Sequence, residues 1–246
     1  MSAFISAIPV HIGAATPSSA LCTLRALPSA FRTPKCKQYS HARSKLHMTV
    51  DGNGGEKRHS VLVPIANGSE EIETSCITDT LVRSGCSVVV ASVEPTKLCL
   101  MSRGLKVEAD VRIEEVVDKE FDLIVIPGGM PGSEHLSRNM TLQKMLKDQH
   151  ARKAKIAAIC AAPAVVLSGL DNMLADVEAT CYPAQHFTEK LGKYVDKPVV
   201  VSGHITTSQG PGTALVFSLS LVEQLFGSTK ALTLAGTMLL DSNENW

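Results

Sequence analysis

The chain has 246 residues, of which 44% are hydrophobic and 20% are charged, with 24 basic and 24 acidic side chains. This composition is typical of a globular protein with ample material for a core, and no apolar run is long enough to span a membrane. Residues 1–50 carry six Lys or Arg and no carboxylate, whereas residues 51–246 carry 18 basic and 24 acidic side chains. Such a mildly acidic core lacks a basic face, which disfavours nucleic acid as the main ligand.

The first part of the chain differs in composition from the rest. Residues 1–57 are interpreted as a disordered or transit-like extension, and residues 58–246 as a single domain. Residues 1–47 are rich in Ser, Ala, Arg and Pro and contain no acid, which is typical of transit peptides. A dispensable tail has the same composition, and translation from Met48 would give a cytosolic protein. The expected location is therefore the cytoplasm, or a plastid- or mitochondrion-like organelle if this segment directs transport.

The domain begins with a strand, a helix and a second strand. Ser60–Ala66 is a short apolar run that predicts a buried strand, and Asn67-Gly68-Ser69 supplies a turn and a helix cap. A helix is expected from about Glu70 to Ser84, with Gly85 as its end. The β-branched run Ser87–Val93 predicts the second strand, which completes a βαβ unit.

Alternation of strands and helices continues along the chain. The expected elements are short strand pieces over Pro95–Arg112, a small helix at Ile113–Val117, strands at Phe121–Ile126 and Lys155–Ile159 with the amphipathic helix Thr141–His150 between them, a helix at Pro163–Leu170, paired strands at Val199–Val201 and Ile205–Thr207, and helices at Gly212–Phe226 and Thr229–Leu240. This order predicts an α/β fold with a doubly wound, mostly parallel sheet sandwiched by helices. The helix at Gly212–Phe226 is apolar around most of its surface, which indicates a core element with some area left for a homodimer.

Three motifs fall at the carboxyl ends of predicted strands, where ligand crevices lie in such sheets. Glu73 follows the first strand, Gly128-Gly129 follows the strand before the amphipathic helix, and Cys160 follows the strand after it. Because the carboxyl ends of parallel strands share one edge of the sheet, a carboxylate, free backbone amides and a thiol are expected to meet at one site.

Cys160 lies where a strand turns sharply into a helix, an arrangement that holds a nucleophile on a strained turn. An arbitrary cysteine is more often a buried core thiol. At a helix N-terminus, however, free amides and the helix dipole favour the thiolate, so the sequence predicts a lowered pKa for this thiol. The small neighbours Ala161 and Ala162 leave room for a substrate.

The acid and the glycines have their own alternative interpretations. An acid at a helix start often only complements the helix dipole, and Glu70 and Glu71 are expected to do so. For Glu73, burial beside a thiolate is expected to raise the pKa, so that a protonated carboxyl donates a hydrogen bond to sulfur and passes protons to substrate. Gly128 and Gly129 form a turn in which backbone N–H groups can approach a developing oxyanion.

The remaining titratable side chains carry weaker signals. Seven cysteines without a CxxC spacing predict neither a disulfide framework nor a zinc site, and they fit a reducing compartment. A Cys–His pair would require His135, His186 or His204 to lie near Cys160 in space, and the sequence does not choose among them.

Four ordered motifs carry a resemblance to a known family: Asn67-Gly68-Ser69-Glu70-Glu71-Ile72-Glu73-Thr74, Ile126-Pro127-Gly128-Gly129, Ala158-Ile159-Cys160-Ala161-Ala162-Pro163 and Ser208-Gln209-Gly210-Pro211-Gly212-Thr213. Together they resemble the ThiJ/PfpI superfamily and, within it, the Parkinson-disease-associated protein deglycase (DJ-one) branch. The resemblance implies a flavodoxin-like fold from about Val61 to Leu240. It also implies a redox-sensitive nucleophile at Cys160, its acidic partner at Glu73, oxyanion amides at Gly128 and Gly129, and Arg103 near the site.

The function implied by this resemblance is that of a cofactor-free enzyme of the hydro-lyase or hydrolase type. It would be a glutathione-independent glyoxalase or protein deglycase that acts on α-oxoaldehydes such as methylglyoxal, or on glycated side chains, in the oxidative-stress response. The alternative is a redox-sensing, cysteine-sulfinate-forming chaperone or regulatory protein with little turnover. The resemblance also implies a homodimer, without a metal or an organic cofactor.

Two positions depart from the patterns of this superfamily. Tyr182, in Cys181-Tyr182-Pro183, stands where human-like members carry a histidine, which puts a proton-transfer role there in doubt. Ala161 stands where PfpI-type peptidases carry a histidine, which disfavours a protease. Arg103, Tyr182 and Ala161 are accordingly candidate substrate-site residues.

Overall fold

The computed structural model describes residues 58–240, which lie within the unit Asn53–Trp246. The transit-like segment at residues 1–47 and the start at Met48 lie outside the described residues, so both stay predictions, as does the domain limit between residues 57 and 58. None of the described helices is long and apolar enough to cross a membrane.

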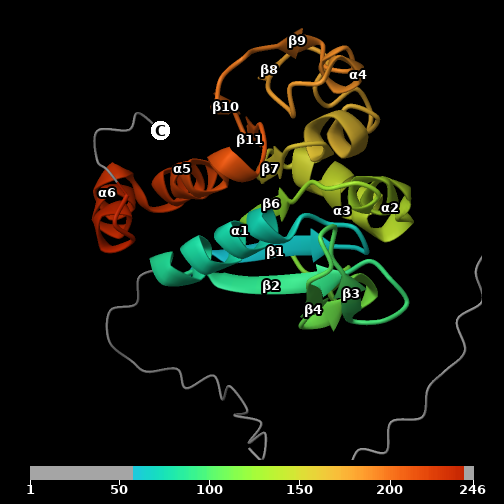
Figure 1. Ribbon diagram of the computed structural model, residues 1–246, viewed down its shortest axis with the longest axis horizontal. Coiled ribbons are helices and arrows are strands. Elements are labelled where there is room, and N and C mark those ends of the chain that lie inside the picture. Colours follow the sequence, from blue (N-terminus) through green and yellow to red (C-terminus); the bar gives the residue numbers. More distant parts are fainter. Residues whose placement is uncertain (1–57, 241–246) are drawn as a thin grey trace, which may run out of the picture. The chain divides into compact units, whose positions relative to one another are not determined.

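A seven-stranded sheet forms the centre of the described residues (Figure 1). Its order is β10-β11-β7-β6-β1-β2-β5, and all neighbouring strands are parallel except β10 and β11. The strands are β1 Ser60–Ile65, β2 Ser87–Ser92, β5 Val111–Arg112, β6 Leu123–Ile126, β7 Lys155–Ile159, β10 Val199–Ser202 and β11 Ile205–Ser208. Two small sheets join β3 Leu98–Leu100 to β4 Lys106–Glu108, and β8 Glu178–Ala179 to β9 Lys193–Tyr194.

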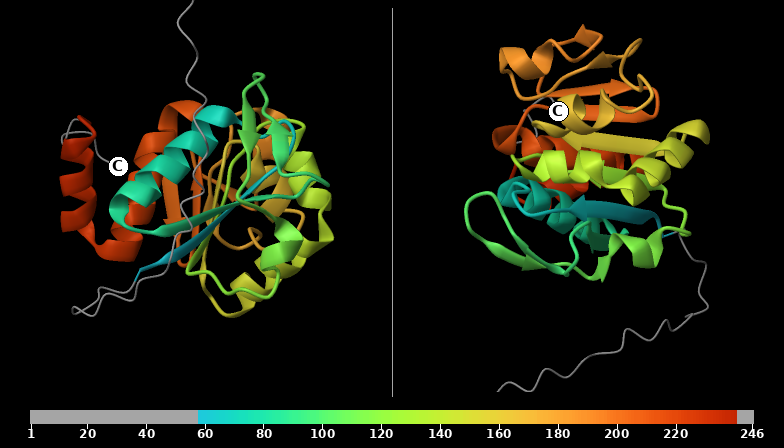
Figure 2. Two further views of the ribbon diagram at one scale, coloured as in Figure 1. Left: turned by 90° about the horizontal axis from the view of Figure 1, so that it is seen from below. Right: turned by 90° about the vertical axis from the view of Figure 1, so that its right-hand side faces the viewer.

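Helices cover both faces of the central sheet (Figure 2). Helices α1 Glu71–Ser84 and α5 Ala214–Phe226 lie on one face, and α6 Ser228–Thr237 packs on α5. Helices α2 Gly132–Arg138 and α3 Met140–Ala151 lie on the other face. The short helix α4 Gln185–Thr188 lies near the β8–β9 pair (Figure 1). The doubly wound, mostly parallel fold predicted from the sequence is thereby confirmed.

Side chains of the buried strands alternate between two apolar layers, as their period of two residues requires. Val61 and Val63 point to the layer shared with α1 and α5, whereas Leu62 points to the layer shared with α2 and α3. Phe217 of α5 is fully buried in the first layer. Because α5 is covered by α1 and α6, it is mainly a core element, and the homodimer stays a prediction that sedimentation of the full chain would test.

The predicted elements differ from the observed ones mainly where the backbone is irregular. Pro163–Leu170, expected to be a helix, begins with the π-helical turn η2 Pro163–Leu167. Ile113–Val116 is the 3₁₀ turn η1, and a further 3₁₀ turn, η3 Pro211–Thr213, precedes α5. Helix α2 was not predicted, because the preceding glycines and prolines are typical of a turn.

The chain reverses its direction of winding between β1 and β6. Strand β1 pairs with β2 on one side and with β6 on the other, so the loops that follow β1 and β6 leave the sheet toward opposite faces. This reversal is the place where open α/β sheets bind ligands. Strand β7, which ends at Ile159, is the next strand beyond β6 and brings its own carboxyl end to the same place.

Candidate active site

Cys160 directly follows β7 and has a φ of +63°, which lies in the left-handed region that side chains other than glycine rarely adopt. Its N–H donates to the Ser208 carbonyl at 3.0 Å, and its carbonyl accepts from the Tyr182 N–H at 2.8 Å. These two bonds hold the strained residue in place, in agreement with the sharp turn expected after Ile159.

Glu73 lies in the first turn of α1, and none of its surface is exposed. Its Oε2 accepts the Gly128 N–H at 2.7 Å, while Oε1 is buried without a hydrogen-bond partner. The carboxyl group lies beside the Cys160 side chain, and each group shifts the pKa of the other. A Cβ added to Gly128 would lie 2.5 Å from Cys160 Cβ and 2.9 Å from Glu73 Oε2, so only glycine fits between the acid and the thiol.

The carboxyl group of Glu73 is held in a setting that favours its protonated form. Burial is the main cause that raises its pKa from 4.5 to about 7, and the negative charge of Glu70 adds to the rise. The Gly128 N–H acts in the opposite direction. Glu70 is the N-cap of α1, and its Oε2 accepts the Glu73 N–H at 2.7 Å, so this residue also fixes the position of Glu73. The predicted rise in the pKa of Glu73 is confirmed, whereas the predicted cap at residues 67–69 is replaced by Glu70.

The predicted lowering of the Cys160 pKa is wrong. Burial, followed by the charge of Glu73, raises the pKa of Cys160 to about 12, although the Gly129 and Ala161 N–H groups lower it. No α-helix begins at Cys160 to supply the expected dipole, because η2 follows instead. Protonation of Glu73 removes the charge repulsion but not the effect of burial, which is the larger cause. Glu73 therefore loses its proton at a lower pH than Cys160 does, and the ionised carboxylate lies beside a protonated thiol.

Of the two amides predicted to hold an oxyanion, Gly128 is already engaged. Gly128 donates its N–H to Glu73, so it positions the acid and is not free for an oxyanion. The N–H groups of Gly129 and Ala161 instead lower the pKa of the Cys160 thiol, so both favour negative charge on the sulfur. Ala161 was predicted only as a substrate-site residue. Its amide was missed because the direction of a backbone N–H depends on loop torsion angles that the sequence does not reveal.

A cavity of about 250 Å³ opens at Cys160. Its wall includes the three predicted substrate-site residues Arg103, Tyr182 and Ala161. Tyr182 is 46% exposed and packs edge-on against Phe187, another wall residue, with ring centroids 6.5 Å apart. The cation and the aromatic rings give this small cavity both a polar and an apolar side.

Glu71 holds the part of this wall that contains Arg103. Its Oε1 accepts the Arg103 N–H at 2.7 Å, and its Oε2 accepts the Ser102 hydroxyl at 2.8 Å. Glu71 was expected only to complement the helix dipole. The structure adds a positioning contact that joins α1 to the loop after β3, which places the guanidinium group at the rim of the cavity.

No histidine lines the cavity at Cys160. The histidines considered for a dyad contact other side chains: His135 contacts Glu94, His186 contacts Phe187, and His204 contacts His150. The geometry of the described residues therefore gives no support to a Cys–His dyad. Within the same residues, no three His, Cys, Asp or Glu side chains gather as a metal site.

Residues 59–224 match the sequence model of the DJ-1/PfpI family. The chain belongs to this family. It is 38% identical over 221 residues to Protein DJ-1 homolog B of Arabidopsis thaliana, which covers 87% of this chain and 50% of that protein. It is also 38% identical over 189 residues to the glutathione-independent glyoxalase DJR-1.2 of Caenorhabditis elegans, which covers 75% of this chain and 97% of that protein.

The solved structures give the same assignment. The structure of oxidized DJ-1 from Toxoplasma gondii has a TM-score of 0.72 and 44% identity, and covers 74% of this chain and 98% of that one. The chain spans about half the length of the DJ-1 homologs A and B of Arabidopsis thaliana, 47% and 50% respectively. The superfamily resemblance and the flavodoxin-like fold expected from the sequence are thus confirmed.

Proposed function

We propose that the chain is a glutathione-independent glyoxalase that converts small α-oxoaldehydes such as methylglyoxal into 2-hydroxy acids. The observation that carries this proposal is the contact between the Cys160 thiol and the buried, readily protonated carboxyl group of Glu73 at a small open cavity. The named activity of the Caenorhabditis elegans relative supports it.

The reaction begins with attack of the Cys160 sulfur on the aldehyde carbon. A sulfur–carbon bond forms and the carbonyl π electrons move to oxygen, while ionised Glu73 takes the proton from the thiol and passes it to that oxygen to give a hemithioacetal. The N–H groups of Gly129 and Ala161, which favour negative charge on the sulfur, would support the charge as it moves to the adjacent oxygen.

The ionised Glu73 next removes the proton from the former aldehyde carbon and returns it to the neighbouring carbonyl carbon, while the hydroxyl proton of the hemithioacetal passes to the neighbouring carbonyl oxygen. The first carbon is oxidised and the second is reduced, so the conversion to a thioester with a 2-hydroxyl group is an internal redox step. Water then cleaves the thioester, which releases the 2-hydroxy acid and restores the thiol. A pKa of about 7 suits Glu73 to both steps, because the group exchanges its proton easily near neutral pH.

We propose deglycation of side chains as an extension of the same chemistry. An adduct of an α-oxoaldehyde on a protein side chain presents the same two adjacent carbons to the sulfur. As the sulfur–carbon bond forms, the carbon–nitrogen bond breaks, and the side-chain nitrogen leaves with the thiol proton that Glu73 carries to it. The partial exposure of Tyr182 at the cavity wall is compatible with a substrate larger than methylglyoxal.

The glyoxalase proposal is tested with the purified full chain and methylglyoxal in the absence of glutathione. We expect lactate to form in proportion to the methylglyoxal consumed over many turnovers, as measured by an enzymatic lactate assay and by NMR. Consumption of only one equivalent of methylglyoxal per chain, with an adduct on Cys160 and no lactate, would contradict the proposal.

The alternative function, a redox sensor, is favoured by one observation. Cys160 is partly exposed at the cavity, whereas Cys86, Cys99 and Cys181 are buried. Cys76 is the matched control because it is also partly exposed and is also on the Glu73 side of the sheet. After mild peroxide treatment we expect peptide mass spectrometry to show two added oxygen atoms on Cys160 before any change on Cys76. Faster oxidation of Cys76 would remove the support for a sensor at Cys160.

A further inference from the structure

The two loops that carry the acid and the amide donor lie backbone against backbone. We call residues 66–70, between β1 and α1, the acid loop, and residues 127–131, between β6 and α2, the amide loop. The Glu70 N–H donates to the Gly128 carbonyl at 3.0 Å. A Cβ added to Gly129 would lie 2.4 Å from the Gly68 oxygen and 2.6 Å from the Glu70 nitrogen. Since no side chain separates the loops at this contact, a displacement of one loop changes its contact with the other.

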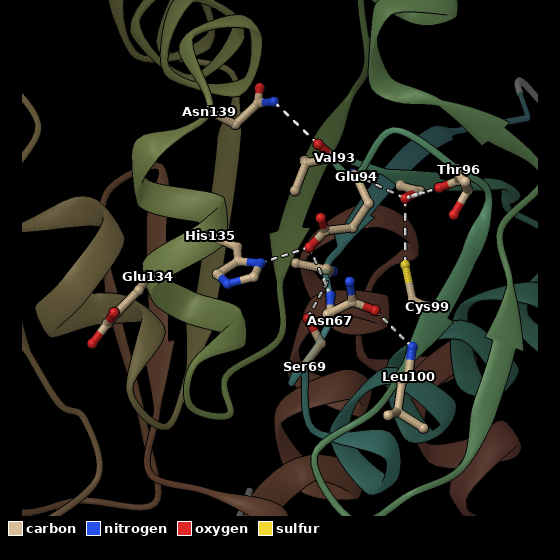
Figure 3. A network of polar contacts seen from close by, with 12 residues as sticks. Asn67, Ser69, Val93, Glu94, Thr96, Cys99, Leu100, Glu134, His135 and Asn139 are labelled. Carbon is tan, nitrogen blue, oxygen red and sulfur yellow. Dashed lines mark hydrogen bonds and ion pairs between the residues drawn. The ribbon is translucent and has the colours of Figure 1, made fainter.

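A polar network joins these loops to the end of β2 (Figure 3). Oε1 of Glu94 accepts the Asn67 N–H at 3.0 Å and lies 2.6 Å from Nδ1 of His135. The Glu94 side chain is only 14% exposed, whereas that of His135 is 37% exposed. Asn67 in turn accepts the Leu100 N–H at 2.8 Å. We call Asn67, Glu94 and His135 the clamp.

Each end of the clamp is attached to one of the two loops. On the amide side, His135 belongs to α2, and its N–H donates to the Pro131 carbonyl of the amide loop at 3.1 Å. On the acid side, Asn67 opens the loop that ends at Glu70, whose carboxylate caps α1 and accepts the Glu73 N–H at 2.7 Å. The clamp therefore connects the amide loop, which contains Gly129, to the acid loop, whose last residue positions Glu73.

We propose that Glu94 and His135 are positioning residues that fix the acid loop against the amide loop. This contact keeps the Gly129 N–H at the Cys160 sulfur and the Gly128 N–H on Glu73. Neither residue lines the Cys160 cavity, so both act through the loops. Loss of the clamp is expected to leave the sheet intact and to move the Gly129 N–H away from the Cys160 sulfur. A misplacement of about 1 Å is enough to reduce an enzymatic rate by about 100-fold.

The test measures the reactivity of Cys160 in the full chain. The rate of its alkylation by iodoacetamide is followed from pH 5 to pH 10 by peptide mass spectrometry, together with kcat and KM for methylglyoxal. We expect His135→Ala to slow alkylation at pH 7 by about tenfold, to move the midpoint of the pH profile upward, and to lower kcat with little change in KM. His135→Asn places an amide nitrogen where Nδ1 lies, so we expect it to recover most of the lost reactivity.

Two further variants separate positioning from general damage. Arg138→Ala removes an exposed ion pair of 3.1 Å with Glu134 on the same helix, and we expect it to leave the pH profile unchanged. Glu94→Gln keeps an acceptor for the Asn67 N–H and removes the negative charge. We therefore expect it to slow the alkylation of Cys160 and raise the midpoint of the pH profile, but by less than His135→Ala does. If Glu94→Gln and a folded His135→Ala both alkylate like the wild type, the proposal is wrong.

Only the turnover measurement depends on the proposed glyoxalase activity. If the wild type makes no lactate but the alkylation profile shifts in the clamp variants, the proposed function fails and the positioning role stands. If lactate forms normally in every clamp variant and the alkylation profiles coincide, the positioning role fails and the proposed function stands.

Discussion

We expect Cys160→Ala to reduce lactate formation from methylglyoxal by at least about 1,000-fold. The methyl group cannot form the sulfur–carbon bond on which each later step depends. Glu73 and the Gly129 and Ala161 amides stay in place in this variant, but they have no covalent intermediate to act on. The measurement is the rate of lactate production at saturating methylglyoxal, with the uncatalysed rate subtracted.

The matched control for this variant is Cys76→Ala, which removes a partly exposed thiol that does not line the cavity. We expect Cys76→Ala to retain the wild-type rate. Thermal unfolding of both variants shows whether the fold is preserved, since Ala keeps the Cβ that the strained backbone at residue 160 already accommodates. Lactate production by a folded Cys160→Ala variant at more than about a tenth of the wild-type rate would rule out covalent catalysis by this thiol.

We expect Glu73→Gln to make the protein less active and, at alkaline pH, more stable. The folded-state pKa of Glu73 is about 7 and its ordinary value is 4.5, so the folded chain binds more protons than the unfolded chain between these values. The wild type therefore loses stability as the pH rises through this range. The uncharged amide does not titrate, so the variant avoids this loss.

The stability difference is measured by urea unfolding at pH 5 and pH 8. At pH 8 we expect the variant to gain at most about 3 kcal/mol, reduced by the cost of a buried amide N–H without a good acceptor. At pH 5 most of this gain is absent, because Glu73 of the wild type is then protonated. Glu120→Gln, at a side chain that is 84% exposed, is the control and is expected to show no such difference. An equal response to pH in the Glu73→Gln variant and the wild type would contradict the raised pKa.

The glyoxalase activity of Glu73→Gln is expected to fall because the amide cannot carry a proton from the former aldehyde carbon to the neighbouring carbonyl carbon of the substrate. The alkylation profile of Cys160 reports on this loss directly. In the wild type the rate is expected to rise as the pH passes about 7, where Glu73 ionises and can accept the proton of the thiol. In Glu73→Gln the buried thiol must lose its proton to solvent, so we expect its midpoint to lie higher. An unchanged midpoint would show that Glu73 does not control this thiol.

Much of the fold was predictable from the sequence because hydrophobic runs of strand length alternate with helices. Cys160 and Glu73 were found because a residue that follows an apolar strand is easily recognised and parallel strands share one edge. Helix α2 was missed because Pro131 and Gly132, at its start, are more typical of turns. The π-helical turn after Cys160 was missed because its sequence pattern does not differ from that of an α-helix.

The electrostatics of the site were less predictable than its position. The sequence indicates a helix after Cys160, but the pKa of this thiol depends mainly on burial and on Glu73, which is distant in the sequence. The direction of the Gly128 N–H likewise depends on the loop backbone. Glu94 and His135 are 41 residues apart in the sequence, and no motif joins them. Contacts of this kind are known only when the loops have been placed in space.

The hydrogen bond from the Cys160 N–H to Ser208 has a consequence for biosynthesis. Strand β11, which supplies the Ser208 carbonyl, is the last strand of the central sheet to be translated. A nascent chain that has not yet released this strand from the ribosome carries the thiol without one of the two bonds that hold its backbone. The backbone at the nucleophile is therefore completed late in synthesis, after Glu73 and Gly129 have already emerged.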